Sequence, residues 1–139
     1  SSNIYKHVWS VYDTDDFPAQ NIDKVVDLCH TYSNEENTYH ALWANQCIEL
    51  WFLLHFSFIH SNLHRQEYWA KLSSCLAKLN TSEYKKNRSD MYQLLEPYME
   101  QAISNAKKLA NINKGKKVFQ STPGTAVYRL IEKLLPYLK

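Results

Sequence analysis

The most constraining feature of this sequence is a strand, helix, strand pattern in its first 45 residues. Residues 7–12, HVWSVY, are rich in β-branched and aromatic side chains, which predicts a strand buried on both faces. A helix is expected to open at residues 17–18, because apolar residues then recur at helical spacing: Ile22, Val25, Val26 and Cys29. After a polar loop, residues 39–44, YHALWA, predict a second strand. A unit of this length favours parallel strands joined by a right-handed crossover, so an α/β fold with a short parallel sheet is expected.

The rest of the chain has the pattern of a helix-rich region. Residues 47–58 are apolar almost all round, which predicts a central, buried helix. Further helices are predicted where apolar residues recur at helical spacing, in residues 69–79, 89–110 and 125–138. Pro97 lies inside the second of these stretches and should kink or split that helix.

The length of the chain predicts one domain. Its 139 residues fall in the usual range, and no linker or repeat divides them, so residues 1–139 are expected to form a single domain. Within it, residues 1–45 would form the strand, helix, strand portion and residues 46–139 the helical portion. Two strands cannot make an independent parallel sheet, so either the helices cover a very small sheet or further strands precede residue 1. The early first strand favours the second alternative, and we expect a fragment of a longer protein.

Three features of the sequence exclude several classes of protein: its cysteines, its hydropathy and its motifs. The three cysteines, Cys29, Cys47 and Cys75, lie far apart and form no CxxC pair, so reduced thiols in a cytoplasmic protein are expected. No apolar stretch approaches the roughly 20 residues that span a bilayer, so no membrane partner is expected. The sequence holds no P-loop, GxGxxG or GxSxG motif, which leaves an NTPase, a dinucleotide enzyme or an α/β-hydrolase without support.

Charge is unevenly distributed along the chain. Residues 1–40 carry seven acidic and two basic side chains, whereas residues 41–139 carry seven acidic and fourteen basic ones. The candidates for contact with a phosphate backbone are Lys85, Lys86, Arg88, Lys114, Lys116 and Lys117. An acidic N-terminal part beside a basic C-terminal part is what a protein would need to bind a metal cation and a polyanionic substrate together. The alternative is that these charges only solvate helix faces.

Two aspartates, Asp13 and Asp15, directly follow the first predicted strand. Ligands of open α/β sheets bind outside the carboxyl ends of the strands, and alternate residues of an extended chain point the same way. Two carboxylates placed in this way can converge on Mg²⁺ or Mn²⁺, and such an ion can activate water and stabilise a phosphoryl transition state. The alternative is that these acids cap the helix that is expected to open near Pro18. Spacing alone leaves both interpretations open.

Glu49 and His55 interrupt the otherwise apolar stretch at residues 47–58. A buried ionisable group is costly unless it is paired, so both residues are candidates for a functional site. The alternative for His55 is a core histidine whose hydrogen bonds are satisfied. Asn45 stands at the expected junction of strand and helix, where a side-chain cap is favoured.

Three stretches, VWSVYDTDDF, WANQCIELWFLLHF and STPGTAVYRLIEKL, occur in this order and together resemble the RloB-like family. Proteins of that family are found near restriction and phage-defence loci and are related to Toprim-fold proteins. The resemblance therefore implies the C-terminal part of a Toprim-like fold and a Mg²⁺-dependent nuclease that acts on nucleic acid, on RNA more than on DNA. The alternative is a non-catalytic module that binds nucleic acid or protein, for instance as a partner of a defence ATPase.

The resemblance also implies roles for particular residues. Asp13 and Asp15 would be metal ligands of the catalytic site. Glu49 and His55 fall in the most specific of the three stretches and would support the chemistry, while Asn45 would orient the site.

The sequence departs from the family pattern in two respects. Three residues differ from those that are common in the family, in ways that look tolerable: Ala44, Gln46 and Ile48. In Toprim proteins a glutamate after an upstream strand completes the metal site, and no such segment precedes Asp13 here. We therefore expect this glutamate to lie outside the present sequence, or to have been lost.

Overall fold

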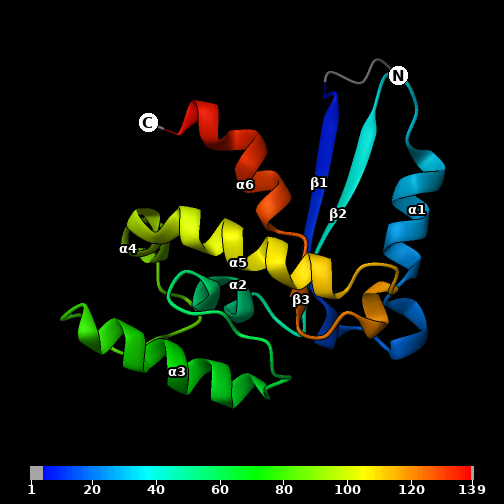
Figure 1. Ribbon diagram of the computed structural model, residues 1–139. Helices are drawn as coiled ribbons and strands as arrows, with labels where there is room; N and C mark the ends of the chain where they lie inside the picture. Colours follow the sequence, from blue (N-terminus) through cyan, green and yellow to red (C-terminus); the bar gives the residue numbers. More distant parts are fainter. Residues whose placement is uncertain (1–4, 139) are drawn as a thin grey trace.

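A three-stranded sheet with helices on both sides forms the frame of the molecule (Figure 1). The structure is a computed structural model that describes residues 5–138, apart from the side chains of residues 16 and 19. Strand β1 (His7–Asp13) pairs in parallel with β2 (Thr38–Asn45), in a register that runs from His7 opposite Thr38 to Asp13 opposite Ala44. The predicted α/β fold and its parallel strand pair are therefore confirmed.

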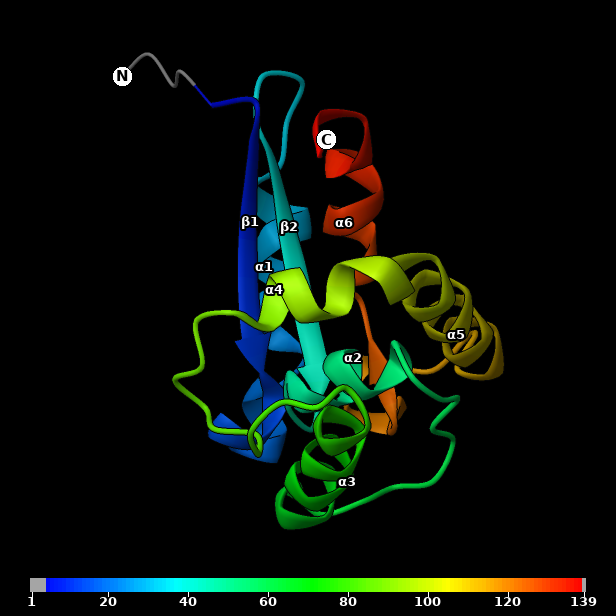
Figure 2. The same ribbon diagram turned by 90° about the vertical axis from the view of Figure 1, so that its left-hand side faces the viewer.

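The prediction that the first strand is buried on both faces is wrong. In the described part of the chain β1 lies at an edge of the sheet and pairs with β2 alone, and Val11 of β1 is 52% exposed. Helix α1 (Lys24–Tyr32) packs chiefly against β2 and covers one face of the sheet, where it lies behind the strands in Figure 2. The apolar composition of β1 therefore does not correspond to burial.

The crossover helix begins later than the sequence predicts. Residues 14–16 form a 3₁₀ turn, η1 (Thr14–Asp16), and a second such turn, η2 (Ala19–Asn21), precedes α1. The N–H of Asn21 donates to the carbonyl of Pro18 at 2.8 Å, which closes the chain over three residues rather than four. The expected start at residues 17–18 therefore lies between two 3₁₀ turns, and the helix itself begins at Lys24.

The helical portion lies on the other side of the sheet from α1 (Figure 2). Its helices are α2 (Glu49–Leu54), α3 (Arg65–Lys78), α4 (Met91–Leu95), α5 (Met99–Ile112) and α6 (Tyr128–Leu134). The 3₁₀ turn η3 (Glu96–Tyr98) separates α4 from α5, which confirms the predicted break at Pro97. Helix α2 is shorter than the apolar stretch that predicted it. It is central nonetheless, because Leu50 and Leu54 are buried in the core together with Leu72 of α3 and Ala106 of α5.

A third strand, β3 (Gly124–Thr125), was not predicted. It pairs antiparallel with the end of β2, with Thr125 opposite Ala44 and Gly124 opposite Asn45. Because these residues join the sheet, the last helix begins at Tyr128 rather than near Thr125. Two further 3₁₀ turns, η4 (Val118–Gln120) and η5 (Leu135–Tyr137), flank this segment.

Between residues 5 and 138, none of the helices has both the length and the apolar character needed to cross a bilayer.

Candidate functional site

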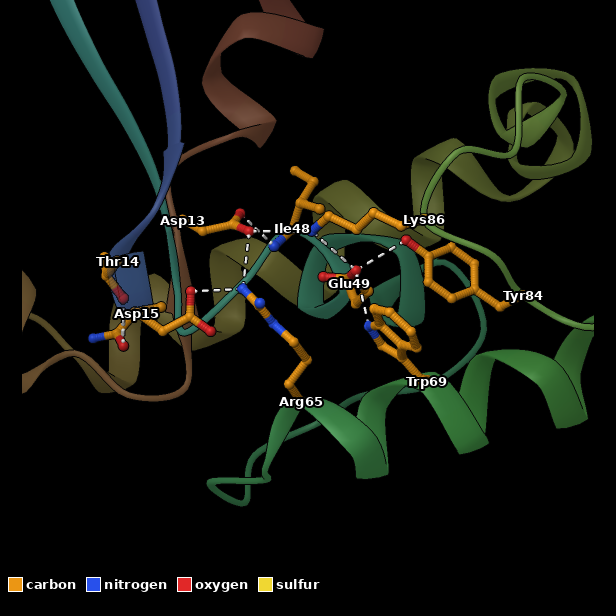
Figure 3. Close-up of polar contacts among 10 residues, drawn as sticks. Asp13, Thr14, Asp15, Ile48, Glu49, Arg65, Trp69, Tyr84 and Lys86 are labelled. Atoms are coloured by element: carbon orange, nitrogen blue, oxygen red, sulfur yellow. Dashed lines mark hydrogen bonds and ion pairs between the residues drawn. The ribbon is translucent and has the colours of Figure 1, made fainter. Parts of the chain in front are cut away.

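The carboxyl ends of β1 and β2 meet the start of α2, and this junction carries the candidate site (Figure 3). Thr14 turns inward here, and its buried hydroxyl donates to Asn45 Oδ1 at 2.9 Å. Asn45 Nδ2 in turn donates to the carbonyl of Val118 at 2.9 Å. The N–H of Asp15 donates to the carbonyl of Gln46 at 3.1 Å. These bonds hold the segment between the two aspartates against the end of β2, which is consistent with the orienting role predicted for Asn45.

Asp13 and Asp15 converge on one positively charged atom. Arg65 Nη2 lies 2.8 Å from Asp15 Oδ1 and 3.5 Å from Asp13 Oδ2. Asp13 Oδ2 also lies 3.3 Å from Lys86 Nζ, while its Oδ1 accepts the backbone N–H of Ile48 at 2.8 Å. Ile48 directly precedes α2, so Asp13 serves the start of that helix and not the start of α1. The side chain of Asp16 lies outside the described residues.

Glu49, the first residue of α2, is a buried carboxylate beside this pair. Its Oε1 accepts from Trp69 Nε1 at 3.0 Å, from the Tyr84 hydroxyl at 2.9 Å and from Lys86 Nζ at 3.3 Å. Burial acts to raise the pKa of Glu49, but the backbone N–H, the Tyr84 hydroxyl, the Cys47 thiol and Lys86 together hold it below its ordinary value. Glu49 is therefore ionised at neutral pH, and Lys86 links it to Asp13.

His55 does not join this cluster. Its Nδ1 lies 2.9 Å from the carbonyl of Trp51, so this nitrogen carries the proton and donates, and the ring packs edge-on against Trp51. Burial lowers the pKa of His55 to about 4. None of the hydrogen bonds in residues 5–138 connects its ring to Asp13, Asp15 or Glu49. This is the geometry of a neutral core histidine in the turn that ends α2.

The predicted nucleic-acid-binding residues are spread over separate places. Lys86 lies in the carboxylate cluster. Arg88 instead bonds within its own loop: its Nε lies 2.6 Å from Asp90 Oδ1, and its Nη1 donates to the carbonyl of Ser82. Lys85 is exposed beside them. The remaining lysines, Lys114, Lys116 and Lys117, follow α5.

Lys114 and Lys116 line a cavity of about 290 Å³ together with Trp43 and Arg129. Lys117 is exposed next to it. These residues form a second basic region on another part of the molecule, so the six predicted residues do not make one continuous stripe.

Sequence reasoning missed Arg65, the residue that binds both aspartates. Arg65 is the first residue of α3, and a cation there is unfavourable beside the positive end of a helix dipole. That unusual position is the one feature of the sequence that could have indicated Arg65 as a site residue. Trp69 and Tyr84 were also missed, because nothing in their spacing indicates that both donate to Glu49.

The arrangement can be tested for its fit to a divalent metal ion. Among the described residues, no three histidine, cysteine, aspartate or glutamate side chains form a group that could hold a metal. Asp13 and Asp15 nevertheless supply two carboxylates around one point. Mg²⁺ is often held by only one or two carboxylates, with water and substrate phosphate completing its shell. The two carboxylates meet this minimum, and Arg65 Nη2 lies between them.

The fold and the site together define an α/β domain with a carboxylate pair at the carboxyl end of a parallel strand. The family model for RloB-like proteins matches residues 1–134, so the chain belongs to the RloB-like family. This confirms the family resemblance that its three sequence stretches indicated. No curated protein and no solved structure matches the chain.

Proposed function

We propose that this chain is a Mg²⁺- or Mn²⁺-dependent nuclease domain of Toprim type, which cleaves RNA in preference to DNA and acts in phage defence. The observation that most supports this proposal is the convergence of Asp13 and Asp15 on a single cationic atom, Arg65 Nη2, at the end of β1. A carboxylate pair at this edge of an α/β sheet is suited to holding the metal ion of a phosphodiesterase.

In this proposal each residue of the site has a distinct task. Asp13 and Asp15 hold the metal ion, which, when bound, supplies an activated water and stabilises the developing charge on the phosphoryl group. Asn45 positions the two aspartates through Thr14. Glu49 holds Lys86 beside Asp13. His55 acts indirectly, by fixing the end of the helix whose first residue is Glu49.

Cleavage of labelled RNA and DNA by the full-length protein, with Mg²⁺, Mn²⁺ or EDTA, tests the proposal. The present sequence alone should cleave weakly or not at all, because the glutamate that completes a Toprim metal site is expected outside it. We expect cleavage only with a divalent ion, and loss of more than about 100-fold in rate in Asp13→Asn and Asp15→Asn, since even residues that only support metal ligands contribute about 10–100-fold. His60→Gln, on an exposed loop, is the matched control and should cleave normally. Metal-dependent cleavage that survives in both aspartate variants would contradict the proposal.

A second candidate function is a non-catalytic module that binds nucleic acid or protein, for instance as a partner of a defence ATPase. It is favoured by the ion pairs that Arg65 and Lys86 already make with the carboxylates. This alternative predicts RNA binding without turnover under every metal condition. If nucleic acid is the partner, the affinity should fall steeply as salt rises.

A further inference from the structure

We propose that Arg65 and Lys86 form the substrate-phosphate-binding pair of this site, and that Arg65 gives up its place between the two aspartates when a divalent metal ion binds. The inference rests on the proposed metal-dependent function and deepens it. It assigns a task to the two basic residues that contact the carboxylates, and it predicts that Arg65 and the metal ion compete for Asp13 and Asp15.

The first support is the position of Arg65. One nitrogen of its guanidinium touches both Asp15 and Asp13, at 2.8 Å and 3.5 Å, so the carboxylates are oriented as they would be around a single ion. A metal ion and a guanidinium cannot share that point, because both are positive and both need the same oxygens. Binding of the ion therefore requires Arg65 to turn away.

The second support is the charge of the cluster. Asp13, Asp15 and Glu49 are three carboxylates, and Arg65 and Lys86 are two cations, so these five side chains carry one net negative charge. A divalent ion turns this into one net positive charge. The single negative charge of a phosphodiester then neutralises the site, so that metal and substrate complete it together.

The third support is the difference in solvent exposure between the basic and the acidic side chains of the site. The side chains of Arg65 and Lys86 are 38% and 48% exposed, whereas that of Asp13 is 13% exposed and Glu49 is fully buried. The cations thus lie on the solvent side of the carboxylates, where a phosphate group would arrive. In Figure 3 Arg65 reaches both aspartates from α3, and Lys86 reaches Asp13 from the loop that also carries Tyr84.

The chemistry of the two side chains suits different tasks. The planar fork of an arginine matches two oxygens of one phosphate, whereas a lysine acts as a point charge. Lys86 keeps its place when Arg65 moves, because its Nζ donates to Glu49 Oε1 at 3.3 Å. The same oxygen accepts hydrogen bonds from Trp69 and Tyr84, which fix its position. Lys86 is therefore the fixed member of the pair, and Arg65 is the one that exchanges partners.

Two binding measurements on the full chain test the inference. Free Mn²⁺ is followed by electron paramagnetic resonance, and binding of a short phosphorothioate RNA, which resists cleavage, is followed by fluorescence anisotropy with Mn²⁺ present. In Arg65→Gln we expect Mn²⁺ to bind about two- to fivefold more tightly, because a competing ion pair is gone. RNA should bind about tenfold more weakly, because a charge-assisted contact is gone. The slope of log affinity against log salt should shrink by about 0.7.

Arg65→Lys keeps the charge but loses the fork, so it should bind Mn²⁺ nearly as the natural chain does while still binding RNA more weakly. Lys78→Gln removes an exposed charge from the other end of the same helix and should change neither affinity. Opposite shifts in Mn²⁺ and RNA affinity distinguish the proposed role from a merely structural one, in which both affinities would fall together.

The outcomes separate this inference from the proposed function. If Asp15→Asn abolishes Mn²⁺ binding but Arg65→Gln leaves it unchanged or weakens it, the metal site stands and the exchange by Arg65 is refuted. If Mn²⁺ fails to bind to the natural protein and to both variants, in the present chain and in the full-length protein alike, the metal-dependent function itself is refuted, and the inference with it.

Discussion

At the scale of single residues, the two ionisable side chains of the apolar stretch at residues 47–58 have opposite environments. Glu49 has donors from three side chains and is held as a carboxylate. His55 Nδ1 lies within hydrogen-bond distance of two backbone carbonyls, those of Trp51 and Phe52, and burial keeps its ring neutral. The sequence predicted that both would be buried, and that outcome is confirmed. Which of them faces the aspartates could not be predicted, because it depends on Trp69 and Tyr84, which lie 20 and 35 residues further along the chain.

The buried neutral His55 should make the stability of the chain depend on pH. Its pKa is about 4 in the folded chain and about 6.5 when unfolded, so between these values the unfolded state binds the additional proton. The stabilisation is therefore complete above about pH 6.5 and is lost as the pH falls towards 4. The shift corresponds to about 3 kcal/mol in the free energy of unfolding.

Urea denaturation of the natural chain and of His55→Gln, at pH 7, 6, 5 and 4.5, measures this effect. The variant should be less stable at pH 7 but should lose less stability on acidification. Parallel pH profiles for the two chains would show that His55 titrates normally. His60→Gln, which alters an exposed histidine, serves as the control.

At the scale of elements, the two long strands have similar compositions but different environments. Both carry aromatic residues, and each was predicted correctly as a strand. Only β2 lies between two other strands, so only β2 has neighbours along both of its edges in the described chain. Periodicity indicates that a segment is extended, but a strand's place in the sheet depends on pairing with distant residues such as Gly124.

This difference between the strands predicts unequal costs of substitution. Leu42→Ala in β2 should lower the free energy of unfolding by about 2–5 kcal/mol, because Leu42 is buried and its removal leaves a cavity. Val11→Thr in β1 should change it by less than about 0.5 kcal/mol, since Val11 is largely exposed. Chemical denaturation of both variants checks this, and a large loss for Val11→Thr would mean that another surface covers β1 in solution.

At the scale of the whole molecule, β3 joins the C-terminal part of the chain to the end of β2. Gly124 lies so close to its neighbours that an added Cβ would stand 2.7 Å from the carbonyl oxygen of Ser121 and 3.2 Å from the ring of Trp43. The same segment supports the site, because Asn45, which binds Thr14, pairs with Gly124. The candidate site therefore depends on residues from both ends of the chain.

Gly124→Ala should destabilise the chain by about 1–3 kcal/mol, because backbone atoms would have to move to admit the methyl group. Gly115→Asn is the matched control. Gly115 has open space around it but a φ of 83°, which strains L residues and asparagine less than most, so a small loss of stability is expected there. Thermal melting of both variants measures the difference, and equal melting temperatures would argue against the close packing at β3.

The sequence by itself determined the class of fold, the parallel strand pair, the break at Pro97 and the position of Asp13 and Asp15 at a strand end. These features follow from local preferences and periodicity, which are properties of neighbouring residues. Only the tertiary structure decided that β1 is an edge strand, that two residues near the C-terminus form β3, and that Arg65 and Lys86 approach the carboxylates. The contacts of Arg65 and Lys86 with the two aspartates join residues 50 or more positions apart, and no local pattern encodes a pairing at that distance.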